Sequence, residues 1–356
     1  MVAGLLEVRV PEPAQVSPEP RSGVRKFVPA ASLSSLEALG DQFALNAATE
    51  RKRMLVIVNP YATTVSDRLR NLVVYALQGR YDVDAIDTEA RDHATALTRE
   101  AAGEGYDVVV AFGGDGTVNE AANGLRGSAT PLTCLPGGST NVYARMLGIP
   151  NDIVDATEHL LRIADDWRPR QVHMAMVNER SFLFSAGLGL DASVVARVES
   201  HPKLKARFGP YYFAYAGFGE FFGKYVTNAP RLEAISDGGA PLPGATVLVQ
   251  KGDPYTYFRR IPIHAGQGAQ LTDPSLAGVV LRNTRASVMP GVLWRLFSAR
   301  AQLTRHRQVD GFTGVRELEV RTTDGRPIPL QVDGDYIGDV TQAVFRVDDA
   351  PLHVVS

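Results

Sequence analysis

The sequence predicts a two-domain protein, in which an α/β domain built on an open parallel sheet is followed by a β-rich domain. Two observations support this prediction. Between residues 54 and 135, short continuous apolar runs alternate with segments of helical period, as expected for a parallel sheet that is buried on both faces. Beyond residue 170, short strand-like runs separated by Gly, Pro, Asp and Asn take over, as expected for an antiparallel sheet or sandwich.

In the first domain we expect four strands, at 54–58, 81–86, 106–112 and 131–135, and three helices, at 66–79, 90–102 and 117–123. The helix at 66–79 is indicated by apolar residues that fall on one stripe. In an open parallel sheet, ligands bind at the carboxyl ends of the strands. The turns that follow these four strands are therefore the places to look for functional residues.

In the second part we expect strands at 172–177, 181–186, 245–250, 277–282, 315–321, 328–332 and 343–347, with an aromatic, partly helical insert at 203–226. The prolines near the start and the lack of periodicity indicate a partly disordered arm over residues 1–50. The expected domains are then 51–168 and 169–356. Whether the last residues return to the first domain is left open.

Composition narrows the class of protein. A net charge of −2 and a pI near 6.4 give no overall positive field, so we expect no nucleic-acid partner. The single cysteine, Cys134, allows no disulfide within the chain, and the N-terminus lacks a basic signal-peptide region. The longest aromatic-apolar segment, 211–222, is too short to span a bilayer and contains Glu220. We therefore expect a cytoplasmic protein, in which any contact with lipid would be made from the membrane surface.

The most informative motif is the glycine-rich run at 113–117. It directly follows an expected strand and precedes an expected helix, where backbone amides and a helix N-terminus can receive phosphate oxygens. The alternative interpretation is a tight turn stabilised by Asp115. Thr117 at the start of the helix, with Asn119 and Glu120 just inside it, favours the phosphate-binding interpretation. No Walker sequence or dinucleotide fingerprint is present at this motif.

An ordered series of motifs makes residues 52–348 resemble the catalytic domain shared by diacylglycerol kinases, sphingosine kinases and their bacterial relatives. The run at 113–117 alone also occurs in NAD kinases, but the ordered series is more specific. The resemblance implies an NAD kinase-like parallel-sheet domain followed by an antiparallel β-sandwich domain. The motifs are Asn59-Pro60, Thr88, 113–120, 136–141 and 332–335.

The resemblance also implies ATP and Mg²⁺ as cofactors, and it assigns roles to residues. Asp115 would act through the Mg²⁺ that is carried with ATP, or by ordering the catalytic group. Thr88 would hydrogen-bond the nucleotide, and Ser139, near Asn141, would supply the hydroxyl of the fourth loop. The phosphates would be lined by Asn59, Pro60, Tyr61, Ala62 and Thr63, and by the central loop Gly113, Gly114, Asp115, Gly116, Thr117, Val118, Asn119 and Glu120.

By the same resemblance, the general base maps to Asp335, with Asp333 beside it; which of the two accepts the proton is left open. The alternative for this run is a simple hairpin turn. The chain departs from the family at residue 62, at Val142, and at Asp335, where the relatives have Glu. The segment 277–279 lacks the carboxylate of the relatives' structural magnesium site. Asp273 lies nearby, and we leave that site unassigned.

The resemblance implies an ATP-dependent lipid kinase that phosphorylates a lipid alcohol, with diacylglycerol as the family's substrate and phosphatidic acid as its product. Such an enzyme would associate peripherally with the inner face of the membrane. Cations and aromatics at 201–212 suit that role, although a solvated helix end is an equal alternative. A homodimer is left open. The competing hypotheses are an NAD kinase-like small-molecule kinase and a catalytically weak lipid-binding regulatory protein.

Overall fold

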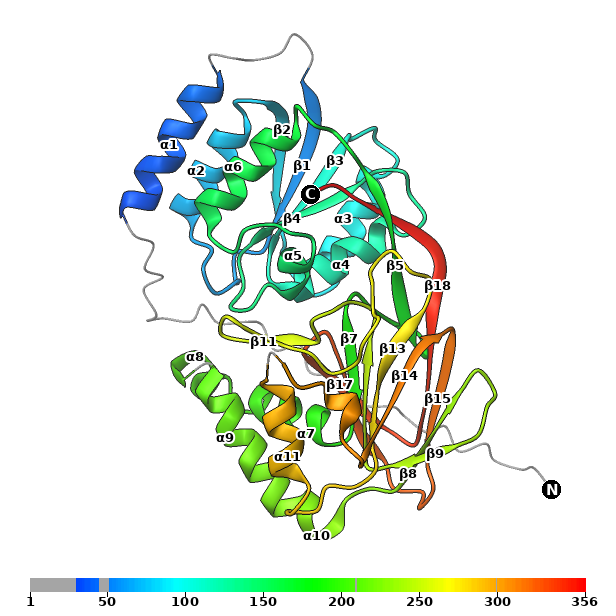
Figure 1. Ribbon diagram of the computed structural model, residues 1–356. Helices are drawn as coiled ribbons and strands as arrows, with labels where there is room; N and C mark the ends of the chain where they lie inside the picture. Colours follow the sequence, from blue (N-terminus) through cyan, green and yellow to red (C-terminus); the bar gives the residue numbers. More distant parts are fainter. Residues whose placement is uncertain (1–29, 45–50, 209, 299) are drawn as a thin grey trace, which may run out of the picture.

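A computed structural model describes residues 30–44, 51–208, 210–298 and 300–356. Figure 1 shows an N-terminal part with helices on both sides of a sheet, and a C-terminal part dominated by strands. Residues 1–29 and 45–50, which belong to the expected N-terminal arm, lie outside the described residues. The remainder of that arm forms a helix, α1 (Ala30–Ala44), which the sequence analysis did not expect.

The N-terminal part is built on four parallel strands. These are β1 (Lys52–Val58), β2 (Tyr81–Asp87), β3 (Val108–Gly113) and β4 (Leu132–Pro136), in the order β2-β1-β3-β4. All of β3 and β4 and most of β1 are buried. Such burial on both faces explains why these strands read as continuous apolar runs. The predicted parallel sheet is therefore confirmed.

Helices cover this sheet because each presents an apolar stripe to it. In α2 (Asp67–Leu77) the buried stripe is Leu69, Val73, Ala76 and Leu77, and the Ser66 side chain caps its N-terminus. Leu33 and Leu36 bring α1 into the same core. The other helices of this part are α3 (His93–Ala101), α4 (Asp115–Leu125), α5 (Val142–Met146) and α6 (Ile153–Ile163).

The C-terminal part is a sandwich of two antiparallel sheets. One has the order β14-β13-β10-β7-β16-β17, and the other contains β18, β15, β8 and β9, with β5 and β6 attached to β18. Buried side chains from both sheets form one core, in which Phe182 and Phe345 meet edge to face at 6.3 Å. The predicted antiparallel arrangement is confirmed. The bounds are β5 Arg170–Val177, β6 Arg180–Phe182, β7 Ser185–Leu188, β8 Leu232–Ser236, β9 Leu242–Gly244, β10 Thr246–Gln250, β13 Leu276–Leu281, β14 Val309–Val315, β15 Glu317–Thr322, β16 Ile328–Val332, β17 Asp335–Val340 and β18 Gln342–Val354.

Helices and a small hairpin cover one side of the sandwich (Figure 1). The aromatic insert is helical, and no helix among the described residues is long and apolar enough to cross a bilayer. The hairpin pairs β11 (Thr256–Phe258) with β12 (Ile261–Ile263). The helices are α7 (Leu190–Glu199), α8 (Pro202–Phe208), α9 (Pro210–Glu220), η1 (Phe221–Tyr225), α10 (Val226–Asn228), α11 (Met289–Leu296) and η2 (Leu303–Arg305).

Strand β18 connects the two parts. It pairs antiparallel with β15 and β5, and its end runs parallel to β4 through the pair Val354 and Leu132. The register shifts between Val347 and Pro351. Beside this shift, the buried Asp348 forms an ion pair with Arg126 at the end of α4. One continuous sheet therefore runs through both parts and holds α4 in place relative to the sandwich.

Candidate active site

The four loops that follow the parallel strands, each singled out from the sequence, lie at one edge of that sheet. In register, Val58 of β1 stands beside Asp87 and Phe112, and Gly113 stands beside Pro136. The residues that follow these strands are linked by backbone hydrogen bonds between loop and neighbouring strand, including that from Asn59 N to Phe112 O at 2.9 Å. The four motifs are thus brought together, as the strand order predicts.

The first loop, 59–64, is tied to the start of α4. Asn59 donates from Nδ2 to Thr117 Oγ1 at 3.0 Å, and its Oδ1 accepts the amide of Tyr61 at 2.9 Å. The Tyr61 and Thr63 side chains are exposed, whereas Ala62 is buried. Thr64, which the sequence analysis did not single out, donates from both its amide and its hydroxyl to Gly137 O. Loops one and four are therefore joined directly.

The loops that follow β2 and β3 offer a ligand mainly backbone groups rather than side chains. Thr88 is buried, and its amide donates to Val58 O at 2.8 Å. Val118 is buried in the core, so it can offer a ligand only its backbone. Glu120 accepts the amide of Ala94 at 3.3 Å and thereby positions the start of α3. These contacts hold the loop that follows β2 against α4.

Two glycine pairs allow the third and fourth loops to pack backbone against backbone. A Cβ placed on Gly138 would lie 2.8 Å from Gly114 Cα, and one on Gly137 would lie 2.9 Å from Gly113 Cα. Any side chain would force the loops apart. Asn141, in the left-handed region at φ 50°, binds both the amide and the carbonyl of Gly138. Its role is therefore to shape this loop, while Ser139 stands exposed at the tip.

Asp115 lies in the first turn of α4 but serves another helix. Its two carboxylate oxygens accept the amides of Val142 and Tyr143, each at 3.0 Å, and so cap the start of α5. Burial raises the pKa of this carboxyl to about 6, although the two amide hydrogen bonds oppose the shift. The residue before α4 is Gly114, which makes no side-chain cap. The first-turn amides of α4 are thus left open to an anion.

Asp333 is a buried acceptor with four donors. Its carboxylate accepts the amides of Leu183, Phe184 and Ser185, and Nδ2 of Asn119, over 2.7–3.1 Å. Burial raises its pKa to about 7, against the opposing effect of these hydrogen bonds. Asp333 and Gly334 both have positive φ, 49° and 88°, and form the two-residue turn between β16 and β17.

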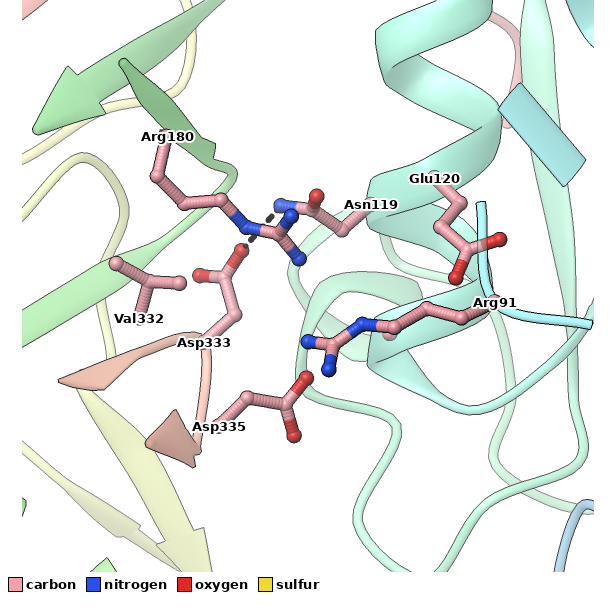
Figure 2. A pocket seen from close by; sticks show the side chains of 8 residues that line it. Arg91, Asn119, Glu120, Arg180, Val332, Asp333 and Asp335 are labelled. Atoms are coloured by element: carbon pink, nitrogen blue, oxygen red, sulfur yellow. Dashed lines mark hydrogen bonds between the residues drawn. The ribbon is translucent and has the colours of Figure 1, made fainter. Parts of the chain in front are cut away.

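Asp335 begins β17 and differs sharply from Asp333. Within the described parts of the chain, its carboxylate has no hydrogen-bond or ion-pair partner. A Cβ on Gly116 would lie 3.5 Å from Asp335 Oδ2, so this carboxylate stands over the first turn of α4. In Figure 2 it points into the space beside Arg91, whereas Asp333 points away toward Asn119. One acid of the pair is therefore structural, and the other is free.

A pocket lies between the N-terminal part and the sandwich, and it contains both acids (Figure 2). Two arginines that were not predicted from the sequence also line this pocket. Arg91 lies three residues after Thr88, and this closeness in sequence to an expected nucleotide-binding residue could have identified it. Arg180 is brought in only by the pairing of β5 with β6, and its Nε is buried without a hydrogen-bond partner among the described residues. The lining is Arg91, Gly116, Asn119, Glu120, Arg180, Val332, Asp333 and Asp335.

The donor set fits a metal ion that arrives with a nucleotide. No group of three or more His, Cys, Asp or Glu side chains suited to a metal occurs in the described chain. Magnesium in nucleotide sites commonly needs only one or two carboxylates beside the phosphates. Asp335 is free, and Asp115 keeps one lone pair on each oxygen after its two amide bonds. Asp115 could therefore contribute a ligand once phosphates are present.

Near Asp273, where the sequence analysis left a magnesium site unassigned, the structure contains a side-chain cation. Lys251 is fully buried, and its Nζ donates to the carbonyl oxygens of Gln270, Leu271 and Asp273 at 2.7–3.2 Å. Burial lowers the pKa of this ammonium to about 8. Three carbonyl oxygens that could face an ion are therefore already bonded to Lys251.

In sequence, the chain is similar to known diacylglycerol kinases. Residues 53–173 match the family model described as the diacylglycerol kinase catalytic domain. A curated diacylglycerol kinase from Staphylococcus aureus is 32% identical over 172 residues, which are 47% of this chain and 53% of the relative. Another from the same species is 33% identical over 174 residues, again 53% of the relative. The chain thus spans about half the length of the curated relatives it matches.

Solved structures share the fold over a longer stretch. A diacylglycerol kinase from Bacillus anthracis superposes with a TM-score of 0.64 at 18% identity, covering 86% of this chain and 98% of the other. A second structure from that organism gives a TM-score of 0.65 at 20% identity, with the same coverage. The resemblance to the diacylglycerol kinase family and the two-part fold are therefore both confirmed.

Proposed function

We propose that this chain is an ATP-dependent lipid kinase, which transfers the γ-phosphoryl group of ATP to the hydroxyl of a lipid alcohol. Diacylglycerol, giving phosphatidic acid, is the substrate we infer from the relatives' names. The observation that carries the proposal is the free carboxylate of Asp335. It stands over the open N-terminus of α4, in a pocket that two arginines line.

The N-terminal part would bind the nucleotide. Phosphoryl transfer demands oriented donors around the phosphate and little covalent chemistry from the protein. The paired glycines at 113–114 and 137–138 let the two loops pack backbone against backbone without a side chain between them. The phosphate would be received by the open first-turn amides of α4 and by its helix dipole. Asn59 and Thr64 tie loop one to this cradle. Magnesium bound with ATP, and ligated by Asp115, would supply further positive charge.

Asp335 would act as the general base. The lipid oxygen forms the new O–P bond, its proton passes to the Asp335 carboxylate, and the bond from phosphorus to the ADP oxygen breaks. A base must have a lone pair available toward the attacking hydroxyl. Asp335 has this, whereas four donors already occupy the carboxylate of Asp333.

Asp333, Gly334 and the two arginines would support this step. Asp333 fixes the turn on which Asp335 stands, and Gln331 adds a hydrogen bond from Gly334 N to its Oε1 at 2.9 Å. Arg91 and Arg180 place positive charge around the pocket, where the transferring phosphoryl group would carry negative charge. The enzyme would work in the cytoplasm, at the inner face of the membrane.

The test is ATP consumption by the purified full chain across a panel of lipid alcohols in mixed micelles. The panel includes diacylglycerol, ceramide, a sphingoid base and a polyprenyl alcohol, with NAD as the control acceptor. The proposal expects ADP and a phosphorylated lipid in equal amounts. Phosphorylation of NAD alone would establish the small-molecule kinase. Lipid binding without any ATP turnover would establish the regulatory alternative.

A further inference from the structure

Helix α9 and the residues that follow it expose a continuous aromatic stripe. Tyr211, Tyr215, Phe218 and Phe222 are spaced four, three and four residues apart, so they lie on one face. Their exposed fractions are 62%, 64%, 60% and 59%. The opposite face is buried, since Tyr212 and Ala216 pack with Val198 of α7. A side chain of this size normally packs into a core, so four in a row on the surface call for a partner.

The stripe continues onto neighbouring elements. At the tip of the β11–β12 hairpin, Arg259 donates to Tyr211 Oη at 3.1 Å, and Phe258 contacts Phe297 edge to face at 5.8 Å. Phe297 follows α11, whose Met289 and Val292 share a buried cluster with Phe221 and Tyr225 of η1. On α11, Trp294 is 63% exposed. We call Tyr211, Tyr215, Phe218, Phe222, Trp294 and Phe297 the aromatic surface.

The chain around the aromatic surface is strongly basic. The segments 201–231, 255–263 and 285–308 contain twelve Lys and Arg residues and a single acid, Glu220. That acid is 5% exposed and paired with Arg197 and Lys224. The whole chain, by contrast, has a net charge of −2. Positive charge is therefore concentrated in the segments that present the aromatic side chains.

We propose that the aromatic surface docks onto a bilayer that contains anionic lipids, a proposal that builds on the lipid-kinase function. Trp, Tyr and Phe suit the boundary between head groups and acyl chains, and the surrounding cations suit anionic head groups. The hairpin also reaches the N-terminal part, because Arg145 donates to Arg259 O at 3.3 Å and lies over the Tyr257 ring. The docked face thus adjoins the region between the two parts, where the lipid must enter.

A second copy of the chain would fit the aromatic surface less well than a membrane does. Two such faces meeting across a symmetry axis would bring like charges together, which is unfavourable. An anionic bilayer instead offers charge of the opposite sign, together with an apolar layer for the aromatic rings. Charge complementarity therefore selects the membrane.

The experiment is sedimentation of the full chain with phosphatidylcholine vesicles, with and without an equal share of phosphatidylglycerol. The test variants are Tyr215→Ser/Phe218→Ser and the charge reversal Arg260→Glu, and the control variants are Ile86→Ser and Arg68→Glu, both on the exposed surface of the N-terminal part. We expect the double aromatic variant to weaken vesicle binding by roughly tenfold or more. Arg260→Glu should weaken it by about fivefold or more, only on anionic vesicles. Both controls should bind like the wild type.

The proposal would be overturned if the aromatic variant bound vesicles as tightly as the wild type does. It would also be overturned if the wild type bound equally well with and without phosphatidylglycerol. A dimer, seen by light scattering, that the aromatic variant dissociates would overturn it as well. Activity separates this proposal from the kinase function. With diacylglycerol in detergent micelles, the variants should phosphorylate at the wild-type rate, and with the same substrate in vesicles they should be slow. If the aromatic variant loses vesicle binding but the wild type shows no kinase activity, only the kinase proposal is refuted.

Discussion

Asn119 donates a hydrogen bond from Nδ2 to Asp333 Oδ2 at 2.9 Å, across 214 positions of sequence. This contact joins the helix that follows the glycine loop to the turn that carries Asp335. Asn119 is itself held by Asn123, which donates to its Oδ1 at 2.9 Å. The proposed phosphate site and the proposed base are thus fixed relative to each other by a buried polar chain.

Removing the Asp333 carboxylate should destabilise the fold. In Asp333→Ala the amides of 183–185 and the Asn119 side chain lose their acceptor while they stay buried. We expect a loss of roughly 2–4 kcal/mol in the free energy of unfolding. Urea denaturation measures it, with the exposed Asp349→Ala as the matched control. Equal stability of the two variants would show that the turn does not depend on Asp333.

The stability contribution of Asp333 should also depend on pH. Its pKa is raised by burial from 3.8 to about 7 in the folded chain. Between pH 3.8 and about 7, the folded chain therefore keeps the Asp333 proton, whereas the unfolded chain has released it. The resulting stability is fully present below pH 3.8 and is lost as the pH rises through about 7. Relative to Asp333→Asn, the wild type should lose free energy of unfolding between about pH 4 and about pH 7. A constant difference between them would contradict this.

The glycine pair between the third and fourth loops should control nucleotide affinity. In Gly138→Ala the new methyl would meet Gly114 Cα at 2.8 Å, so the loops must separate. We expect ATP binding, measured by calorimetry, to weaken by about tenfold or more. The control is Gly217→Ala, whose methyl meets only Val194 at 3.9 Å. Unchanged affinity in Gly138→Ala would remove the glycine contact from the phosphate site.

The two arginines should act on the rate. Each provides positive charge toward the pocket, so Arg180→Ala and Arg91→Ala should each lower kcat/KM for lipid phosphorylation by roughly 10²-fold. Arg180→Lys should recover part of this loss, because it keeps the charge. Arg99→Ala, an exposed change on α3, is the control. If the pocket variants kept the control's rate, neither arginine would bind the transferring phosphoryl group.

The sequence was sufficient for the parallel strands and for the loops that follow them, because buried strands read as apolar runs and their carboxyl ends converge in any such sheet. It could not separate the roles of Asp333 and Asp335. That distinction depends on the amides of 183–185 and on Asn119, which are distant in sequence. Arg180 was missed for the same reason. The helices at 30–44 and 289–296 were missed because much of their burial comes from contacts with distant segments.

The central claim is that Asp335, and not Asp333, accepts the proton of the lipid hydroxyl. The most direct measurement is single-turnover lipid phosphorylation by Asp335→Asn and Asp335→Glu, with ATP affinity measured alongside. Asp335→Asn should react roughly 10²–10⁴-fold more slowly with little change in ATP affinity. Asp335→Glu should keep or raise the wild-type rate, because it restores the longer side chain of the relatives. A near-normal rate in Asp335→Asn would contradict the account.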